Sequence, residues 1–236
     1  MTETIAQRIE KLPWDELGEA LNQRGYAATP PLLTAQECAG LAALYDERER
    51  FRSRIDMMRF RFGVGEYKYF ANPLPPIVAE LRTAFYPRLA AIASQWARTL
   101  DGEPFPSDLA AFLRICHRNG QIRPTPLLLR YEAGGYNCMH QDIYGETVFP
   151  IQLTCVLSER GIDFRGGEFL LLEQRSRAQS RVEAITLEQG ETILFATRER
   201  PVKGGRGYYK VNMRHGVSTI LSGRRFSLGV IFHDAK

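Results

Sequence analysis

The sequence predicts a mainly β fold with a helical N-terminal part: a double-stranded β-helix, or jelly roll, buttressed by α-helices. Residues 1–122 show apolar positions at helical spacing with recognisable helix ends. From Arg123 onward, short β-rich runs alternate with glycine turns, which is typical of antiparallel sandwiches and small barrels. We therefore expect a helical region with a few strands over residues 1–122. It should pack on a jelly-roll core over residues 123–236, in one integrated domain.

The first two helices are predicted from the residues at their ends. Pro13 opens the segment 14–24 and Gly25 ends it, because glycine readily adopts the left-handed conformation that closes a helix. Thr34 and Glu37 have the spacing of a capping box, in which each side chain bonds the backbone N–H of the other. We expect this box to begin an amphipathic helix that continues through "CAGLAALYDERE".

Three more elements are predicted before Arg123. The run "GEYKYF" alternates like a strand. Residues 77–100 form a long helical pattern after a pair of prolines, and Pro87 is expected to interrupt or bend it. Ser107 is expected to cap the last helix, "DLAAFLRICHRN", which stops at Gly120.

Eight short runs after Arg123 are predicted to be strands. Glycines, singly or in pairs, lie between most of them and supply the turns. Eight strands are the number that a jelly roll contains. In chain order the runs are "TPLLLRY", "YNCMHQD", "VFPIQLTCVL", "EFLLLEQ", "RVEAITL", "ETILFA", "YYKVNMRHGVSTI" and "RRFSLGVIFH".

Composition excludes several classes of protein. A content of 44% hydrophobic and 11% aromatic residues is enough for a core, which excludes a wholly disordered chain. No apolar run approaches the roughly 20 residues that a membrane helix needs. The N-terminus carries two acidic residues and no apolar signal region, so it does not resemble a secretory signal. The four cysteines form no CxxC pair, a pattern that suits a reducing cytoplasm. The net charge of +4 says little about partners.

A metal site is predicted from "YNCMHQD". His140 and Asp142 are two residues apart, so on a strand their side chains point to the same face. An imidazole and a carboxylate are two of the three ligands in the facial triad that holds non-haem Fe(II). The third ligand must come from a distant strand, and His215 lies in the seventh predicted strand. His233, at the end of the last strand, is the alternative.

Ten residues after His215, an anchor for a carboxylate ligand is predicted. Strand alternation places Arg225 and Ser227 on one face, and a planar guanidinium beside a hydroxyl binds carboxylates well. If Arg225 faced outward, Arg224 would face inward, so one of these two arginines needs a partner inside the barrel, because an unpaired buried charge is costly.

Together, HxD, a distant histidine and a following RxS resemble the pattern of the Fe(II)/2-oxoglutarate dioxygenases. The resemblance covers roughly residues 125–234. It implies that His140, Asp142 and His215 bind Fe(II), and that Arg225 and Ser227 hold the far carboxylate of 2-oxoglutarate. Tyr131, in "RYEAGGYNCMHQD", is a further candidate contact of this cosubstrate. The implied reaction uses O2, hydroxylates or oxidatively demethylates a C–H bond, and gives succinate and CO2.

Two substrate classes fit the resemblance. "RYEAGGYNCMHQD" looks like the corresponding stretch of the alkylation-repair dioxygenases, although Leu129 stands where that family usually has asparagine and "RRFSLGVIF" lacks its second arginine. "HGVSTILSGRRFSLGVIF" instead resembles the prolyl-hydroxylase type, which acts on protein side chains. Over its length, the chain resembles a bacterial group of 2-oxoglutarate oxygenases that commonly carries a damaged-DNA label.

Basic and aromatic residues suit a polyanionic substrate such as single-stranded nucleic acid, because basic side chains contact phosphates and aromatic rings stack on bases. An ordinary solvated loop and amphipathic strand, an acidic peptide or a small acidic metabolite fit the same residues. "ERFRSRIDMMRFRFGVGEYKYF" interleaves arginines with aromatic residues. The glycine-rich stretch 198–214 is expected to be a loop that overhangs the iron. Its candidate substrate contacts are Arg200, Lys203, Arg206 and Tyr208.

Other classes of function stay open at this point. The same chemistry could act on a protein residue or a small molecule. A jelly roll can also be a non-catalytic metal-binding cupin or a sensor, and a structural interaction protein built on the N-terminal helices would bind no iron. Arg225 discriminates against a cupin, which has no need of it. The sequence does not predict the oligomeric state.

Overall fold

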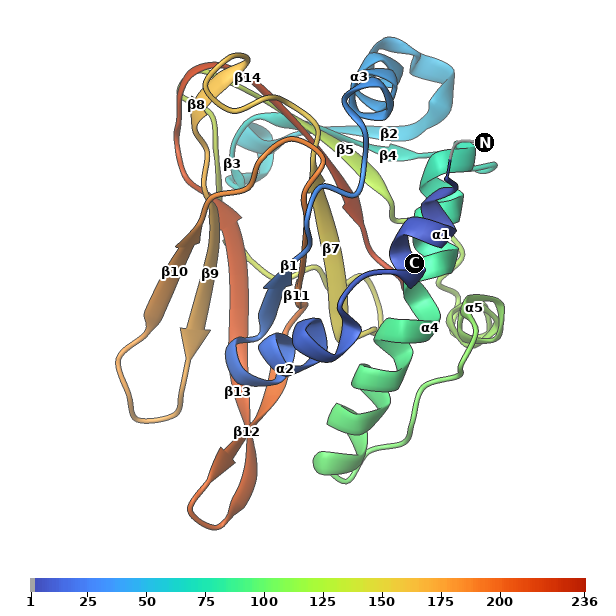
Figure 1. Cartoon of the computed structure of the whole chain (residues 1–236), viewed down its shortest axis with the longest axis vertical. Helices are drawn as coiled ribbons and strands as arrows, with labels where there is room; N and C mark the ends of the chain where they lie inside the picture. The colour runs from blue at the N-terminus through green and yellow to red at the C-terminus, as the bar shows by residue number, and fades with distance from the viewer. Residues whose placement is uncertain (1–2) are drawn as a thin grey trace.

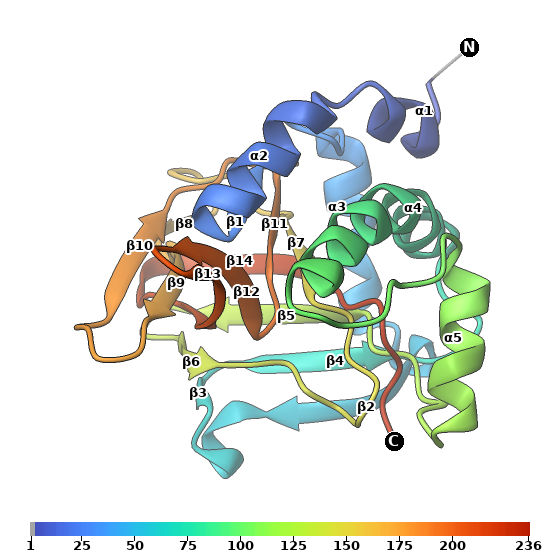
Figure 2. The same cartoon turned by 90° about the horizontal axis from the view of Figure 1, so that it is seen from below.

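The computed structural model describes residues 3–236. Two antiparallel sheets face each other, and helices cover the outer side of the larger sheet (Figures 1 and 2). The helices are α1 (Ile5–Glu10), α2 (Trp14–Arg24), α3 (Ala35–Ala43), α4 (Pro76–Thr99) and α5 (Leu109–Arg118), with the 3-10 helices η1 (Leu44–Asp46), η2 (Arg48–Arg50) and η3 (Met57–Phe60).

The strands form two sheets of the double-stranded β-helix. The larger has the order β1-β11-β7-β14-β5-β4-β2, with β8 paired to β14, and the smaller has the order β10-β9-β13-β6-β3, with β12 paired to β13. In chain order the strands are β1 (Tyr26–Ala28), β2 (Phe51–Asp56), β3 (Gly63–Val64), β4 (Glu66–Phe70), β5 (Leu127–Glu132), β6 (Tyr136–His140), β7 (Ile151–Val156), β8 (Phe164–Gly166), β9 (Phe169–Gln174), β10 (Arg181–Ile185), β11 (Thr192–Ala196), β12 (Glu199–Gly204), β13 (Gly207–Val217) and β14 (Ile220–Val230).

The predicted fold class is confirmed. All eight predicted runs contain a strand: β5, β6, β7, β9, β10, β11, β13 and β14. Four of them (β5, β14, β7 and β11) are neighbours in the larger sheet, and the other four (β6, β13, β9 and β10) are neighbours in the smaller one. The stretch predicted as a basic loop contains a further strand, β12, which pairs with β13.

The helix ends agree with the predictions in two cases. Helix α2 ends at Gly25, whose φ is +80°. The capping box of α3 is formed: the Glu37 backbone N–H donates to the Thr34 hydroxyl at 3.2 Å, and the Thr34 N–H donates to the Glu37 carboxylate at 2.8 Å. Helix α3 is shorter than expected, because the chain tightens into η1 after Ala43.

Two details of the helices differ from the predictions. Pro87 does not interrupt helix α4, because it lies on the exposed face, where water can bond the carbonyl that lacks a donor. The cap of α5 is Asp108 rather than Ser107. The Asp108 carboxylate accepts from the Ala111 backbone N–H at 2.8 Å.

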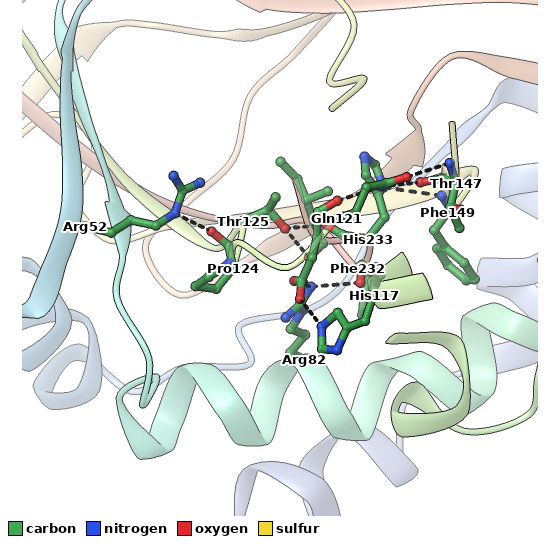
Figure 3. Close-up of polar contacts among 12 residues, drawn as sticks. Arg52, Arg82, His117, Gln121, Pro124, Thr125, Thr147, Phe149, Phe232 and His233 are labelled. Carbon is green, nitrogen blue, oxygen red and sulfur yellow. Dashed lines mark hydrogen bonds and ion pairs between the residues drawn. The ribbon is translucent and has the colours of Figure 1, made fainter. Parts of the chain in front are cut away.

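The end of the chain is tied to the helices and to the loop after β6 (Figure 3). Arg82 of α4 donates to the Asp234 carboxylate at 2.8 Å, and His117 of α5 lies 3.0 Å from its other oxygen. The Gln121 side-chain amide donates to the backbone carbonyls of Asp234 and Thr147, and its oxygen accepts from the Thr147 N–H at 2.8 Å. The helical layer thereby helps to position the β6–β7 loop.

Within residues 3–236, no helix combines the length and the apolar character needed to cross a membrane.

Candidate metal centre and cosubstrate pocket

The three predicted metal ligands lie together between the sheets. Strands β6 and β13 are neighbours, and their register sets His140 opposite His215, with ring centroids 4.1 Å apart. Asp142 joins them, so that one ligand atom from each residue lies within 4.8 Å of the others. Strand β6 ends at His140, however, so the position of Asp142 comes from the loop that follows and not from strand alternation.

The backbone orients the first histidine. The Nδ1 atom of His140 lies 2.8 Å from the Cys138 carbonyl oxygen, and only a protonated nitrogen can donate to that oxygen. In the neutral ring, Nε2 is then free to donate its lone pair to a metal. This Nε2 atom lies 3.6 Å from the Asp142 Oδ1 atom.

The carboxylate is held by two further side chains. The Tyr144 hydroxyl donates to the Asp142 Oδ1 atom at 2.6 Å, and the Gln152 amide donates to the Oδ2 atom at 2.9 Å. Burial by itself would raise the pKa of Asp142, but His140, His215 and the Tyr144 hydroxyl together hold this pKa below its ordinary value. Asp142 is therefore ionised, as a ligand must be.

His215 is buried against aromatic rings. Its ring centroid lies 4.7 Å from that of Phe195, and its Nε2 atom lies 3.2 Å from the Asp142 Oδ2 atom. Burial lowers the pKa of His215, so the imidazole is neutral near pH 7 and available as a ligand. His233, the alternative, is buried elsewhere: its Nδ1 atom accepts from the Phe149 backbone N–H at 3.3 Å.

Arg225 points into the barrel as predicted. It is 1% exposed, and its Nη1 atom donates to the Ser227 hydroxyl at 3.2 Å. Among residues 3–236, no carboxylate oxygen lies within 4.0 Å of its guanidinium, and its Nε–H has no acceptor. Arg224 faces outward, where it pairs with Glu132 at 2.8 Å. A buried cation without an anion is costly, so the site is incomplete without an anionic ligand.

One cavity of about 170 Å³ connects these groups. The three metal-ligand candidates, Arg225, Ser227 and Tyr131 all line it. Tyr131 is fully buried, and its ring lies 6.0 Å from the guanidinium carbon of Arg225. A metal at the His-Asp-His group and a dicarboxylate that reaches Arg225 both fit the donors that line this cavity.

Two residues of the site, Gln152 and Tyr144, were not identified from the sequence. Gln152 is 1% exposed, and its amide oxygen has no hydrogen-bond donor among residues 3–236. The only sequence signal is its polarity inside the apolar run "IQLTCV". Tyr144 lies two residues after Asp142 and also accepts from the Tyr69 hydroxyl at 2.8 Å. Its contact with the carboxylate depends on the path of the loop, which the sequence does not reveal.

Arg200, one of the predicted substrate contacts, is buried and not on the surface. It is 2% exposed, pairs with Glu173 and donates to the Asn22 carbonyl. The other three candidates, Lys203, Arg206 and Tyr208, are exposed at the tip of the β12–β13 hairpin. Tyr208 is seven residues from His215 along β13, which is about 23 Å at the rise of a strand. The hairpin projects from the rest of the molecule (Figure 1).

Fold and donor set define the class, an Fe(II)- and 2-oxoglutarate-dependent oxygenase, as expected. Residues 65–235 match the Oxygenase-NA family, described as an oxygenase catalysing oxidative methylation of damaged DNA, and the chain belongs to this family. An uncharacterised protein of Mycobacterium tuberculosis, found in two strains, is 48% identical over 167 residues, which are 70% of this chain and 72% of the relative.

Solved structures agree on the fold. A 2OG-Fe(II) oxygenase family oxidoreductase from Burkholderia pseudomallei has a TM-score of 0.56 at 15% identity, covering 94% of this chain and 92% of that one. A Trichoplax adhaerens prolyl hydroxylase, solved with a peptide fragment of hypoxia inducible factor, has a TM-score of 0.55 at 12% identity, covering 99% and 94%. At these identities, the likeness shows the fold alone.

Proposed function

We propose that His140, Asp142 and His215 hold the Fe(II) of this oxygenase, and that Arg225, Ser227 and Tyr131 bind the far carboxylate of 2-oxoglutarate. The observation that carries this proposal is the buried Arg225 guanidinium, which has no carboxylate partner among residues 3–236 and lines the same cavity as the three ligands. A cupin or sensor without 2-oxoglutarate would have no use for this cation.

Different residues of the chain orient the metal ligands and exclude water from the cavity. When bound, Fe(II) and 2-oxoglutarate supply the oxidising chemistry, with O2 as the oxidant and succinate and CO2 as products. The backbone carbonyl of Cys138 and the side chains of Tyr144 and Gln152 orient two of the ligands. The buried rings of Phe169 and Tyr131 line the cavity and exclude water from it.

The substrate that we propose is single-stranded nucleic acid with an alkylated base. The description of the family, which names damaged DNA, supports this class. The arginine-rich and aromatic stretch over residues 50–70 supports it independently, because it supplies both phosphate contacts and stacking surfaces.

Anaerobic titration of the apoprotein with Fe(II) and 2-oxoglutarate tests the assignment of residues. The chelate has a metal-to-ligand charge-transfer band in the visible range, which we expect for the wild type. It should disappear in His215→Ala and require at least tenfold more 2-oxoglutarate in Arg225→Ala. Arg224→Ala is the matched control, since the neighbouring arginine faces solvent. Equal bands in wild type and Arg225→Ala would contradict the cosubstrate site.

A further inference from the structure

We propose that strand β2 and the η3 turn form the track along which a single strand of nucleic acid reaches the cavity, with Phe60 and Phe62 as the stacking platform at its entrance. This inference rests on the proposed function, since it names the surface that delivers the substrate to that site. It also replaces the β12–β13 hairpin as the main substrate contact.

The track begins at a basic groove along β2. A hollow of about 530 Å³ is lined by Arg48, Arg52, Arg54 and Lys68, together with Phe51 and Ser53, and by no acidic residue. Arg54 pairs with the carboxylate of Glu66. Arg48 is exposed, and no carboxylate oxygen of residues 3–236 lies within 4.0 Å of its guanidinium.

Two further cations of the groove, Lys68 and Arg52, are held in place by neutral groups and keep their charge for a ligand. The Lys68 ammonium donates to the Tyr45 carbonyl at 2.7 Å and lies 4.2 Å from the Tyr45 ring. Arg52 uses its Nε–H on the Pro124 carbonyl at 2.9 Å and lies 4.5 Å above the Tyr69 ring, so its terminal nitrogens remain available. Such preorganised cations suit phosphate groups.

A series of neighbouring residues leads from the groove toward the cavity. A second hollow, of about 260 Å³, shares Arg54 with the first and is lined by Arg59 and Phe60. Phe60 stacks on Phe62, with ring centroids 5.5 Å apart and planes at 19°. Phe62 in turn lines the metal cavity. Asp56, the one acidic residue of the second hollow, lies 3.9 Å from Arg59.

Phe60 and Phe62 are exposed, but backbone contacts fix the segment that carries them. Phe60 is 53% exposed and Phe62 is 45% exposed, which is unusual for large apolar side chains next to a cavity. The Phe62 carbonyl accepts from the Cys138 backbone N–H at 2.7 Å, two residues before His140. At Gly63 of β3, φ is +141° and a Cβ atom would lie 2.3 Å from the Tyr136 carbonyl oxygen, so only glycine allows this close approach of β3 to β6.

Charge and aromatic character together select nucleic acid as the occupant. Strand β2 has six residues, so it spans about 20 Å, enough for several nucleotides at about 3.4 Å per stacked nucleotide. Exposed rings at the cavity end offer stacking to a base of any sequence. An acidic peptide would use the arginines but has no group that requires the stacked phenylalanines.

Fluorescence anisotropy with a labelled twelve-nucleotide oligothymidine at low salt tests the track. We expect Arg48→Glu/Arg59→Glu to weaken binding at least tenfold and Phe60→Ala to weaken it about fivefold, because stacking contributes substantially per base. Lys203→Glu/Arg206→Glu makes the same change of charge at the hairpin tip and should stay within twofold of the wild type.

Several outcomes would overturn the proposal. They are a larger loss in the hairpin variant, an equal loss in both charge variants, or binding of a twelve-residue polyglutamate as tightly as the oligonucleotide. Absence of oligonucleotide binding by wild type, with the charge-transfer band intact, would reject the track while leaving the metal and cosubstrate sites in place. Loss of that band would instead reject the proposed function.

Discussion

At the scale of single residues, Gln152 shows how the fold completes a site that the ligands alone do not define. Its amide donates to the Asp142 Oδ2 atom at 2.9 Å and lies 3.4 Å from the His215 Nε2 atom. Since outer contacts of this kind fix a ligand before the metal arrives, the amide should contribute to iron affinity without touching the metal.

Replacing Gln152 with leucine should therefore weaken Fe(II) binding about 10- to 100-fold. The side chain keeps its approximate volume, but the Asp142 carboxylate loses a donor and can turn away from the histidines. Anaerobic Fe(II) titration measures the effect, and thermal unfolding of the apoprotein checks that the fold is retained. Tyr144→Phe removes the donor to the other carboxylate oxygen and is the matched comparison. Unchanged affinity in both variants would contradict this positioning role.

Site residues could be identified from the sequence where their side chains are of a type seldom found inside a barrel. His140, His215 and Arg225 stood out because an imidazole or guanidinium inside a barrel has few structural uses. Gln152 did not stand out, since its role exists only when β7 faces the ligands. The burial of Arg200 could not be predicted, because its partner, Glu173, is 27 residues away in the sequence and only the pairing of strands brings them together.

At the scale of elements, the first helix is fastened to the third by one ion pair. Arg8 of α1 donates two bonds to Glu37 of α3, at 2.8 and 2.5 Å, and also bonds the Leu32 carbonyl. This contact with Arg8, opposed by burial, holds the pKa of Glu37 below its ordinary value of 4.5. The pair therefore stabilises the fold above about pH 4.5, and this stabilisation is lost as the pH falls through the lowered pKa.

Glu37→Gln should lower the free energy of unfolding by about 0.5–1 kcal/mol at pH 7 and by much less at an acidic pH below the lowered pKa, where the wild-type carboxylate is protonated. Glutamine can keep the capping box through its oxygen, so the change removes the charge and one of the two bonds from Arg8. Urea denaturation at both pH values gives the comparison. Glu10→Gln, in an exposed pair with Arg88, should have almost no effect at either pH. A Glu37→Gln effect that did not change with pH would argue against the ion pair.

Element types were predictable where local signals agreed with the final packing. The capping box of α3 and the eight barrel strands are such cases. Strand β12 was expected to be a loop because the stretch is rich in glycine, yet it pairs with β13, and Pro201 is tolerated because β12 pairs with no other strand of residues 3–236. The long helix α4 was predicted, but its passage through Pro87 without interruption was not, since exposure of this proline cannot be seen without the packing.

At the scale of the whole molecule, the helical part and the jelly roll share one interior. A single cluster of buried residues extends from Ile5 to Phe232. Tyr86 of α4 packs on Phe149, with ring centroids 5.0 Å apart, and on Phe232, at 5.9 Å. Strand β4 pairs with β5 and so extends the larger sheet into the N-terminal part. We propose that the two parts unfold together.

A fragment of residues 123–236 should accordingly fail to fold. It would expose the surface of the barrel that α4 covers, and each large apolar side chain left in water costs about 1.5–3 kcal/mol. Circular dichroism with heating should show no cooperative transition for the fragment, in contrast to the full chain. A cooperative transition, together with a charge-transfer band from Fe(II) and 2-oxoglutarate, would show that the barrel is an independent domain.

The position of strand β2 at the edge of a sheet also bears on self-association of the protein. It ends the larger sheet, and no other strand of residues 3–236 pairs with its outer side. An open edge of this kind is a template for self-association, and natural proteins guard such edges with charged side chains. Arg52 and Arg54 alternate along β2 with shorter or apolar residues. Two molecules that approached edge to edge would bring these like charges together, so we expect the arginines to disfavour edge-to-edge pairing.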